Sequence, residues 1–338
     1  MFSPYAAKKL YWLPDIENAY GLKIEAIVEM RSVNGIRADG RNYIVKNLGS
    51  SVAVKRLHAL ARALEQIYRQ GGPVCPILRT NHGRFYTRSQ ENVYILQPWI
   101  KGRHVDFTKQ NELKAALQAI GRFHSKPVVL ANEYARELEI PSLYEKYAIR
   151  LQRCQRTLHN HSQLWSQVLD SALWEAMQER AKDSIQSMKE KLIDHRAALL
   201  SKSFCHRDLA PHNLMYRSTQ KITLIDFDLA GFDVSMHDVY QVMNHTMYLH
   251  GWHARDILTI LDTYDACAGM SSQDRKLLYD LMTFPSLLIR EIQDLHKSWK
   301  AGRIKDPEKI KMRIRWVQEI EYAKLQWIEK NRNELFSV

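Results

Sequence analysis

The chain has 338 residues, 45% of them hydrophobic and 25% charged, which are the proportions of a folded globular protein. These values exclude a disordered chain, a collagen and a disulfide-rich scaffold. The formal net charge of +12 favours an anionic partner, such as a nucleotide, a phosphorylated metabolite, a nucleic acid or an acidic polymer. The length exceeds what one small domain needs, so we expect one large two-lobed domain or two ordinary ones.

Hydropathy and cysteine use bear on the compartment. No apolar stretch approaches the roughly 18–20 residues of a membrane span, and the N-terminus lacks the pattern of a signal peptide. We therefore expect a cytoplasmic protein with no membrane partner. The cysteines stand singly, with no C-x-x-C pair, and this spacing predicts reduced thiols at Cys75, Cys154, Cys205 and Cys267.

The first hundred residues have the pattern of strands and turns. Most of the glycines lie here, among short β-branched runs that predict strands at 24–30, 43–46, 52–54 and 93–96. The segment 34–42, with its two glycines, predicts a loop. Helical periodicity predicts a helix over 57–70.

The remainder of the chain has helical periodicity. A proline and a glycine within 97–102 separate the strands from a predicted helix at 111–124, and long amphipathic helices are expected from there to residue 200. A short strand is predicted at 222–225, and helices follow it. We expect a hinge near residue 100, between a β-rich lobe (1–100) and a mainly helical lobe (101–338).

A polar motif between the long helices and the short strand carries the strongest chemical signal. It reads His206-Arg207-Asp208 and ends at Asn213, and Asp226 follows the strand. This is the H-R-D-x-x-x-x-N loop and D-F-x turn of kinase-type phosphoryl transfer. We expect Asp208 and His206 to be catalytic, with Asp208 as the base, and Asn213 and Asp226 to hold Mg²⁺. A zinc site of His206, Asp208 and His212 is the rival interpretation.

A lysine on the third strand of such a small lobe holds the nucleotide phosphates. The segment 52–55 fits the V-A-I-K pattern, so we expect Lys55 to have this role, with Lys46 as the alternative. Glu65 is the local acid that could pair with the lysine.

The segment D-F-D-L-A-G at 226–231, with Asp238 twelve residues after Asp226, resembles the aminoglycoside/choline phosphotransferase family rather than the protein kinases. Protein kinases carry D-F-G and A-P-E, and neither motif is present here. Within that superfamily the chain is similar to the CotS-type proteins of the bacterial spore coat. That similarity covers residues 43–57, 72–74, 83–86, 97–103 and 119–124.

The resemblance implies a protein-kinase-like α+β fold of two lobes and transfer of the ATP γ-phosphoryl group to a hydroxyl of a small molecule, with Mg²⁺. ATP would lie under the segment 34–42, with its adenine against Gln97 and Trp99. The resemblance also implies spore coat proteins as partners and a place in the mother cell or the spore coat. The alternative is a structural coat component with the same fold and little turnover.

A basic run over 297–315 holds eight lysines and arginines against two acids. We expect it to form a solvated helical face, and we do not expect a nucleic acid partner.

Overall fold

The computed structural model describes residues 3–4, 10–30, 33–193, 202–217, 221–304 and 306–336. The chain forms two compact units, of which the first joins Met1–Glu139 with Ser203–Phe232 and the second joins Ile140–Lys202 with Asp233–Val338. The H-R-D loop therefore belongs to the same unit as the N-terminal strands. The lobe boundary expected at residue 100 is a different division and stays a prediction.

The first unit is built on an antiparallel sheet with the strand order β1-β2-β3-β4-β6-β5. Its strands are β1 (Ser3–Pro4), β2 (Ile24–Glu29), β3 (Asn34–Ala38), β4 (Arg41–Gly49), β5 (Thr87–Ser89) and β6 (Asn92–Pro98). Their β-branched residues fit a pleated, half-buried surface. The strands predicted at 24–30, 43–46 and 93–96 are confirmed.

The segment 34–42, predicted as a loop, is instead the hairpin of β3 and β4. Asp39 and Gly40 form its turn, with φ values of 49° and 70°. Two residues at positive φ give the turn the twist that a tight hairpin requires, and Asp-Gly is a favoured pair there. The prediction was wrong because the Asp-Gly pair marks a two-residue turn between strands, and the whole segment around it was interpreted as a loop.

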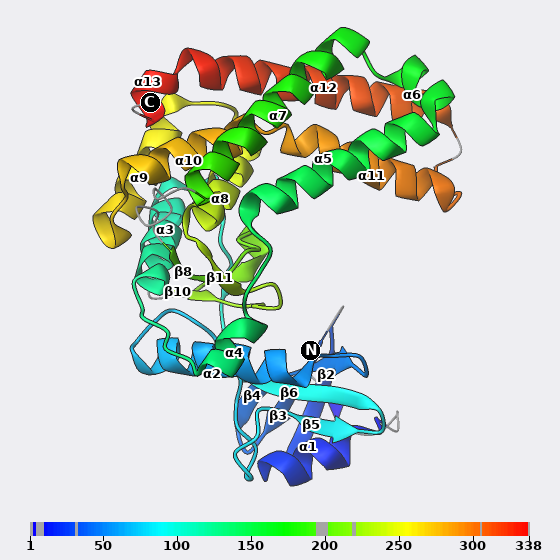
Figure 1. The fold of residues 1–338 in the computed structure, drawn as a ribbon. Coiled ribbons are helices and arrows are strands. Elements are labelled where there is room, and N and C mark those ends of the chain that lie inside the picture. The colour runs from blue at the N-terminus through cyan, green and yellow to red at the C-terminus, as the bar shows by residue number, and fades with distance from the viewer. Residues whose placement is uncertain are drawn as a thin grey trace. The chain divides into compact units, whose positions relative to one another are not determined.

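The two faces of this sheet have different surroundings. One face packs against α1 (Leu13–Tyr20) in a core that includes Ile36, Val45 and Leu96. Side chains alternate along a strand, so Lys46 points to the opposite face. That face is covered by α2 (Val54–Arg69), and Figure 1 shows α1 and α2 on opposite sides of the sheet.

The remainder of the first unit supports the H-R-D loop. It contains α3 (Gln110–His124), α4 (Asn132–Glu137), a sheet of β7 (Arg103–His104), β9 (Leu214–Tyr216) and β10 (Ile222–Leu224), and a pair of β8 (Lys202–Cys205) with β11 (Gly231–Val234). The predicted helix at 111–124 and strand at 222–225 are confirmed.

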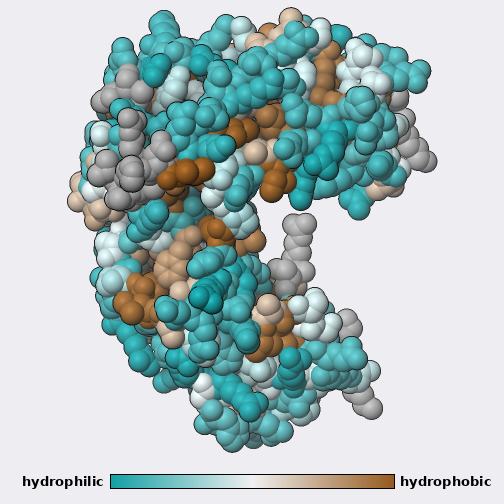
Figure 2. Space-filling view, in the orientation of Figure 1, coloured by the Kyte–Doolittle hydropathy of each residue, from teal (hydrophilic) through white to brown (hydrophobic). Residues whose placement is uncertain are grey.

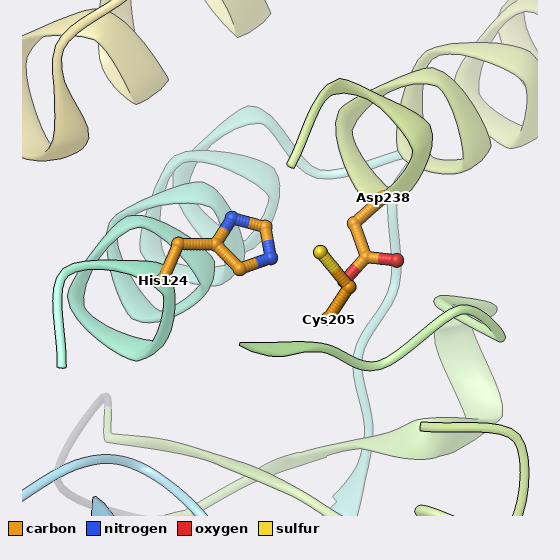
Figure 3. Close-up of side chains that lie close together, drawn as sticks. All are labelled: His124, Cys205 and Asp238. Atoms are coloured by element: carbon orange, nitrogen blue, oxygen red, sulfur yellow. The ribbon is translucent and has the colours of Figure 1, made fainter. Parts of the chain in front are cut away.

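Aromatic side chains fill the space behind this loop. The Phe123 ring lies 6.1 Å from that of Phe204 and 5.7 Å from that of Phe227, and all three are buried. His124 and Cys205 are buried beside each other in the same unit, with ligand atoms within 4.8 Å (Figure 3). Cys205 and the other three cysteines are free thiols.

The second unit is helical, and the long helices predicted from the apolar periodicity are present in its described part. Residues 194–200, at the end of that predicted stretch, lie outside the described residues. Its helices are α5 (Leu143–Asn160), α6 (Ser162–Val168), α7 (Ser171–Ile193), α8 (Met236–His250), α9 (Ala254–Ala268), α10 (Ser272–Thr283), α11 (Ser286–Lys300), α12 (Pro307–Lys330) and α13 (Arg332–Phe336).

The surface shown in Figure 2 is mostly hydrophilic, and its hydrophobic residues gather in small areas. Among the described residues, no helix is both long enough and apolar enough to cross a membrane. Parts of the basic run are neutralised, because Lys311 pairs with Glu308 and Arg313 with Glu291. Lys305, which belongs to this run, lies outside the described residues.

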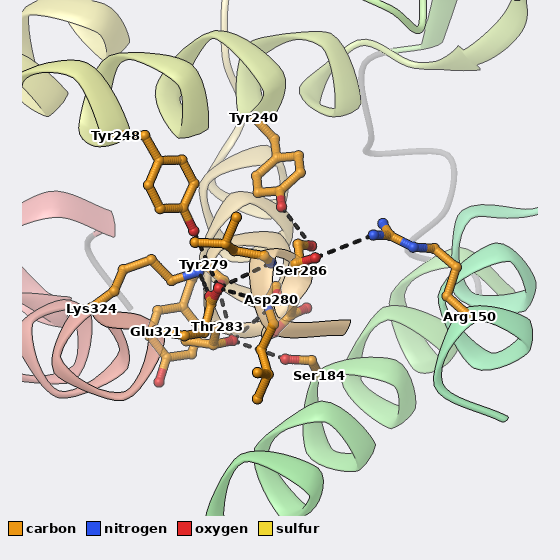
Figure 4. A network of polar contacts seen from close by, with 12 residues as sticks. Arg150, Ser184, Tyr240, Tyr248, Tyr279, Asp280, Thr283, Ser286, Glu321 and Lys324 are labelled. Atoms are coloured by element: carbon orange, nitrogen blue, oxygen red, sulfur yellow. Dashed lines mark hydrogen bonds and ion pairs between the residues drawn. The ribbon is translucent and has the colours of Figure 1, made fainter. Parts of the chain in front are cut away.

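A buried polar network joins the helices of the second unit (Figure 4). Glu321 and Lys324 on α12 form an ion pair with at most 1% of either side chain exposed. The Glu321 carboxylate also accepts the N–H groups of Leu287 and Leu288 in the first turn of α11. The residue before α11, Pro285, provides no side-chain cap, so α12 supplies the negative group that a helix N-terminus favours.

Asp280 on α10 is a second buried acid in this network, and Lys191 on α7 contacts its carboxylate at 2.7 Å. Burial raises the pKa of Asp280 to about 6 from an ordinary value of 3.8, although Lys191 acts in the opposite direction. The folded state therefore holds this proton more tightly than the unfolded state does.

This shift predicts a pH dependence of stability. From pH 4 to pH 6 the unfolded chain has lost the Asp280 proton while the folded chain keeps it, so the free energy of unfolding should fall as pH rises. The loss from this group is up to about 3 kcal/mol, at 1.36 kcal/mol per unit. Denaturant unfolding of the wild type and Asp280→Asn across this range should show the variant gaining relative stability with pH. Parallel curves would contradict the assignment.

Candidate active site

The H-R-D loop begins where β8 ends, and His206 anchors it. The His206 side chain is fully buried, and its Nε2 lies 2.8 Å from the carbonyl oxygen of Ile225. Its Nδ1 accepts the N–H of Asp208, and its ring packs on Phe227 at 4.6 Å. His206 was expected to be catalytic, but a fully buried ring cannot touch a substrate. Its contacts join the loop to the residue before Asp226.

Asp208 and Asn213 lie at the two ends of the loop and hold each other. The side-chain amide of Asn213 donates to the Asp208 carbonyl at 2.8 Å and to its carboxylate at 3.1 Å. Asn213 is 2% exposed, and its carbonyl accepts the N–H of Ile225. The loop thus presents the half-buried Asp208 carboxylate at a fixed place and ties it to the segment that leads to Asp226.

The acid-bearing turn, residues 226–230, follows β10. It is closed by a hydrogen bond from the Ala230 N–H to the Phe227 carbonyl. Asp226 has a φ of 63° and Arg207, in the loop beside it, has a φ of 67°. Such a left-handed conformation costs an ordinary residue roughly 1–2 kcal/mol. Strain of this kind is concentrated at functional sites, where the surrounding contacts maintain it.

Lys46 on β4 reaches the acid-bearing turn from the sheet. Its Nζ lies 2.6 Å from Asp226 Oδ1 and 2.7 Å from both carboxylate oxygens of Asp228. Burial lowers the pKa of Lys46, but the charges and hydrogen bonds of Asp228 and Asp226 outweigh it, so the pKa is raised overall. The lysine therefore stays charged. These three side chains line a cavity of about 330 Å³ between α2 and the face of the sheet that carries Lys46.

The sequence predicted Lys55 on a strand, but the structure places it in a helix. It lies in the first turn of α2, where its side chain is exposed. The chain leaves the sheet after Gly49, and of residues 52–55 only 52 and 53 precede the helix, which begins at Val54. Residues 52–55 match the V-A-I-K pattern in residue type but do not form a strand. Lys46, the alternative, does lie on a strand, β4.

Glu65 also has different partners from those expected. Its carboxylate pairs with Arg79 at 2.6 Å and with Arg69 at 2.9 Å on the surface of the first unit. The Arg79 hydrogen bond is the main reason that the pKa of Glu65 is lowered. Asp226 and Asp228 are the acids that pair with the sheet lysine.

Gln97 and Trp99 lie at the end of β6 and just after it. Gln97 lines the same cavity as Lys46. The N–H of Trp99 donates to the Asn42 carbonyl at 3.1 Å, and its indole ring lies against Gly35 of β3. A Cβ built at Gly35 would overlap Trp99 and would lie 2.7 Å from Val28. Only glycine leaves room for the indole at this point of the sheet.

The donor set fits a hard divalent cation. Three carboxylate oxygens of Asp226 and Asp228 converge on one positive centre, the Lys46 ammonium, at 2.6–2.7 Å. Carboxylate and amide oxygens are the ligands that Mg²⁺ prefers. Asp226 and Asn213, the two expected metal ligands, belong to segments joined through Ile225. By contrast, His206, Asp208 and His212 are not among the described side chains whose ligand atoms converge, so the zinc interpretation finds no support.

Asp228 is a site residue that the sequence analysis did not identify. It follows Asp226 by two residues, and the turn directs both carboxylates to the same ammonium. The signal was present as two acids spaced i, i+2 at the end of an apolar strand.

The fit of Trp99 on Gly35 predicts a coupled effect. Gly35→Ala should lower the free energy of unfolding by about 1–3 kcal/mol, because the added methyl group overlaps the indole. In a Trp99→Ala background the same change should cost less, with the remaining cost set by the contact with Val28, as a double-mutant cycle by denaturant unfolding would reveal. Equal costs in the two backgrounds would show that the contact is not the cause.

Solved structures of known proteins have a similar fold. A solved aminoglycoside phosphotransferase from Alicyclobacillus acidocaldarius is similar over 98% of both chains, with a TM-score of 0.77 and 16% identity. A spectinomycin phosphotransferase bound to ADP and spectinomycin has a TM-score of 0.63 at 14% identity, over 96% of this chain and 100% of that one. An amicoumacin kinase bound to AMP-PNP and Ca²⁺ has a TM-score of 0.65 at 13% identity, over 94% of each.

These likenesses confirm the kinase-like α+β fold, with its β-sheet N-terminal region and its helical C-terminal part. The model of the APH phosphotransferase enzyme family matches residues 35–271, which include the sheet lysine, the H-R-D loop and the acid-bearing turn. The chain belongs to the phosphotransferase enzyme family.

Proposed function

We propose that the protein transfers the γ-phosphoryl group of ATP to a hydroxyl of a small molecule, with Mg²⁺ as the metal. The observation that carries this proposal is the contact of Lys46 with Asp226 and Asp228 at 2.6–2.7 Å in a cavity of the first unit. A site that binds a metal and phosphates together needs acids for the metal and a positive group for the phosphates, and the two acids and the lysine provide these beside the cavity. The similar spectinomycin phosphotransferase is bound to ADP, and the similar amicoumacin kinase is bound to AMP-PNP and Ca²⁺; both support the use of a nucleotide, and the second that of a divalent metal.

Each residue has a distinct task in this mechanism. Lys46 would bind the α- and β-phosphates, Asp226 and Asn213 would hold Mg²⁺, and Asp228 would supply a second carboxylate to the same site. The metal supplies neutralisation of the phosphate charge when it is bound. Gln97, which lines the cavity, and Trp99, just beyond strand β6, would lie against the adenine. His206 keeps the loop and the strand end in register through its contact with Ile225.

Asp208 receives the proton of the acceptor. The acceptor oxygen forms a bond to the γ-phosphorus, the bond from that phosphorus to the bridging oxygen of ADP breaks, and ADP leaves. The proton of the hydroxyl passes to the Asp208 carboxylate, which the amide of Asn213 orients from 3.1 Å.

A small molecule is the favoured acceptor because the chain carries no A-P-E anchor for a polypeptide substrate. After the acid-bearing turn, β11 (Gly231–Val234) leads directly into α8 (Met236–His250). Structures similar to this chain are named for spectinomycin, amicoumacin and aminopropanol, all small molecules.

The finer assignment is a CotS-type protein of the spore coat, made in the cytoplasm of the mother cell and associated with coat proteins. Its support is the small-lobe resemblance, whose core segment 43–57 contains Lys46. A structural coat component of low turnover is the second candidate, but the paired acids and the oriented Asp208 favour an enzyme.

The lysine assignment predicts a clear ranking. Lys46→Met should weaken ADP binding by about 10–100-fold, the equivalent of one charge-assisted hydrogen bond of 1.5–3 kcal/mol. The matched variant Lys55→Met should change it by less than about twofold, because Lys55 is exposed on α2. Titration calorimetry in Mg²⁺ measures both. The opposite ranking would return the phosphate role to Lys55.

The function itself is tested by transfer of label from γ-labelled ATP. The acceptors are a panel of aminoglycosides and amino alcohols beside a mixture of spore coat proteins, and we expect label in the small molecules only. Asp208→Asn should lose at least about 100-fold in rate yet still bind Mg²⁺-ADP, since the base is no nucleotide ligand. Asp226→Asn should lose the metal-dependent binding as well. Label only in protein would refute the small-molecule acceptor, and nucleotide binding without any transfer would favour the structural component.

A further inference from the structure

The acid-bearing turn needs support besides Lys46. Lys46 holds the turn through the side chains of Asp226 and Asp228. In the proposed function these carboxylates face a metal and Lys46 faces phosphates, so that contact is given up at least in part. A second contact must then keep the two carboxylates in place, and it must hold the turn through atoms that bind neither the metal nor the phosphates.

Arg56 on α2 provides such a contact. Its guanidinium donates to the Ala230 carbonyl at 2.7 Å, which is two residues beyond Asp228, and to the Glu137 carbonyl at the end of α4, also at 2.7 Å. Both acceptors are main-chain atoms. The planar guanidinium can bond two separate segments in one fixed geometry, which a lysine ammonium cannot reproduce.

A second arginine holds the neighbouring carbonyl. Arg207 of the H-R-D loop donates to the Leu229 carbonyl at 3.3 Å. Burial lowers the pKa of Arg56, and the nearby charge of Arg207 lowers it further, so two positive groups meet at this point despite their repulsion. Arg56 also lies in the first turn of α2, where a positive charge opposes the helix dipole. Helix formation alone would therefore disfavour an arginine here.

We infer that Arg56 is a positioning residue that holds the turn of residues 226–230 so that Asp226 and Asp228 are in place to receive the metal. The inference rests on the proposed function, since it concerns the metal of that site. Arg56 lines the cavity beside Lys46 but contacts the turn through its backbone, so its effect on a ligand passes through Asp226 and Asp228.

The test compares ADP affinity with Mg²⁺ and with EDTA, by titration calorimetry, in the wild type and in Arg56→Met. We expect the ADP affinity of the variant with Mg²⁺ to be about tenfold lower than that of the wild type, and its affinity in EDTA to be unchanged. Mutation of a residue that supports metal ligands usually lowers metal affinity 10–100-fold. Arg62→Met is the matched control. Arg62 lies on the same helix and stacks on Tyr134 of α4 at 4.9 Å, so it perturbs the α2–α4 contact without touching the turn.

The outcomes separate this inference from the proposed function. A wild type whose ADP affinity does not depend on Mg²⁺ refutes the proposed function and the inference with it. The inference alone is overturned if the wild type depends on Mg²⁺ but Arg56→Met keeps the same ratio of ADP affinity with Mg²⁺ to ADP affinity in EDTA. Equal losses of affinity under both conditions give that result too. Should Arg56→Met fail to fold, Arg56→Lys decides, because it keeps the charge but cannot donate hydrogen bonds to the Ala230 and Glu137 carbonyls in the same geometry. A reduced ratio there supports positioning, and an unchanged ratio refutes it.

Discussion

The first unit depends on one electrostatic constraint, the placing of a single lysine opposite two carboxylates. Three oxygens lie within 2.7 Å of the Lys46 ammonium, and 16% of that side chain is exposed. A desolvated cation would be costly without such partners, and two adjacent acids would repel each other without the cation. The sheet, which carries the lysine, and the turn, which carries the acids, therefore need each other. Charges held in this way suit a site that exchanges one cation for another.

The loop and the turn are held mainly through backbone groups. Ile225 is the central residue, because its carbonyl faces the His206 ring and its N–H donates to Asn213. A ligand that binds to carboxylates cannot displace these bonds. The two strained residues, Arg207 and Asp226, lie within the segments fixed in this way. The carboxylates can change partners while separate hydrogen bonds hold the main chain around them, which is the general requirement of a preorganised site.

The helical unit uses buried charge for a different purpose. The Glu321 carboxylate receives two N–H groups of α11 and the hydroxyl of Tyr248, and Lys324 compensates its charge. Every group in this cluster has a partner, and the buried ion pair is therefore a satisfied structural network. Removing one partner of such a pair is strongly destabilising, since it leaves an uncompensated buried charge.

The sequence by itself determined the fold class and the main strands and helices, because these depend on local periodicity. Short spacings also indicated Asp208 and Asn213 in one loop and Asp226 in the turn after the next strand as candidate site residues. The sequence did not decide which lysine faces the acids. Lys46 and Lys55 both follow β-branched residues, and only the pairing of β4 with β6 and the start of α2 separate them. The backbone contacts of Arg56 with Glu137 and Ala230 were out of reach, and for Asp228 the sequence showed the i, i+2 spacing of two acids but not that both face Lys46. The partners of Arg56 and Asp228 lie far along the chain, as Lys46 does from Asp228, and contacts of that range are set by tertiary packing.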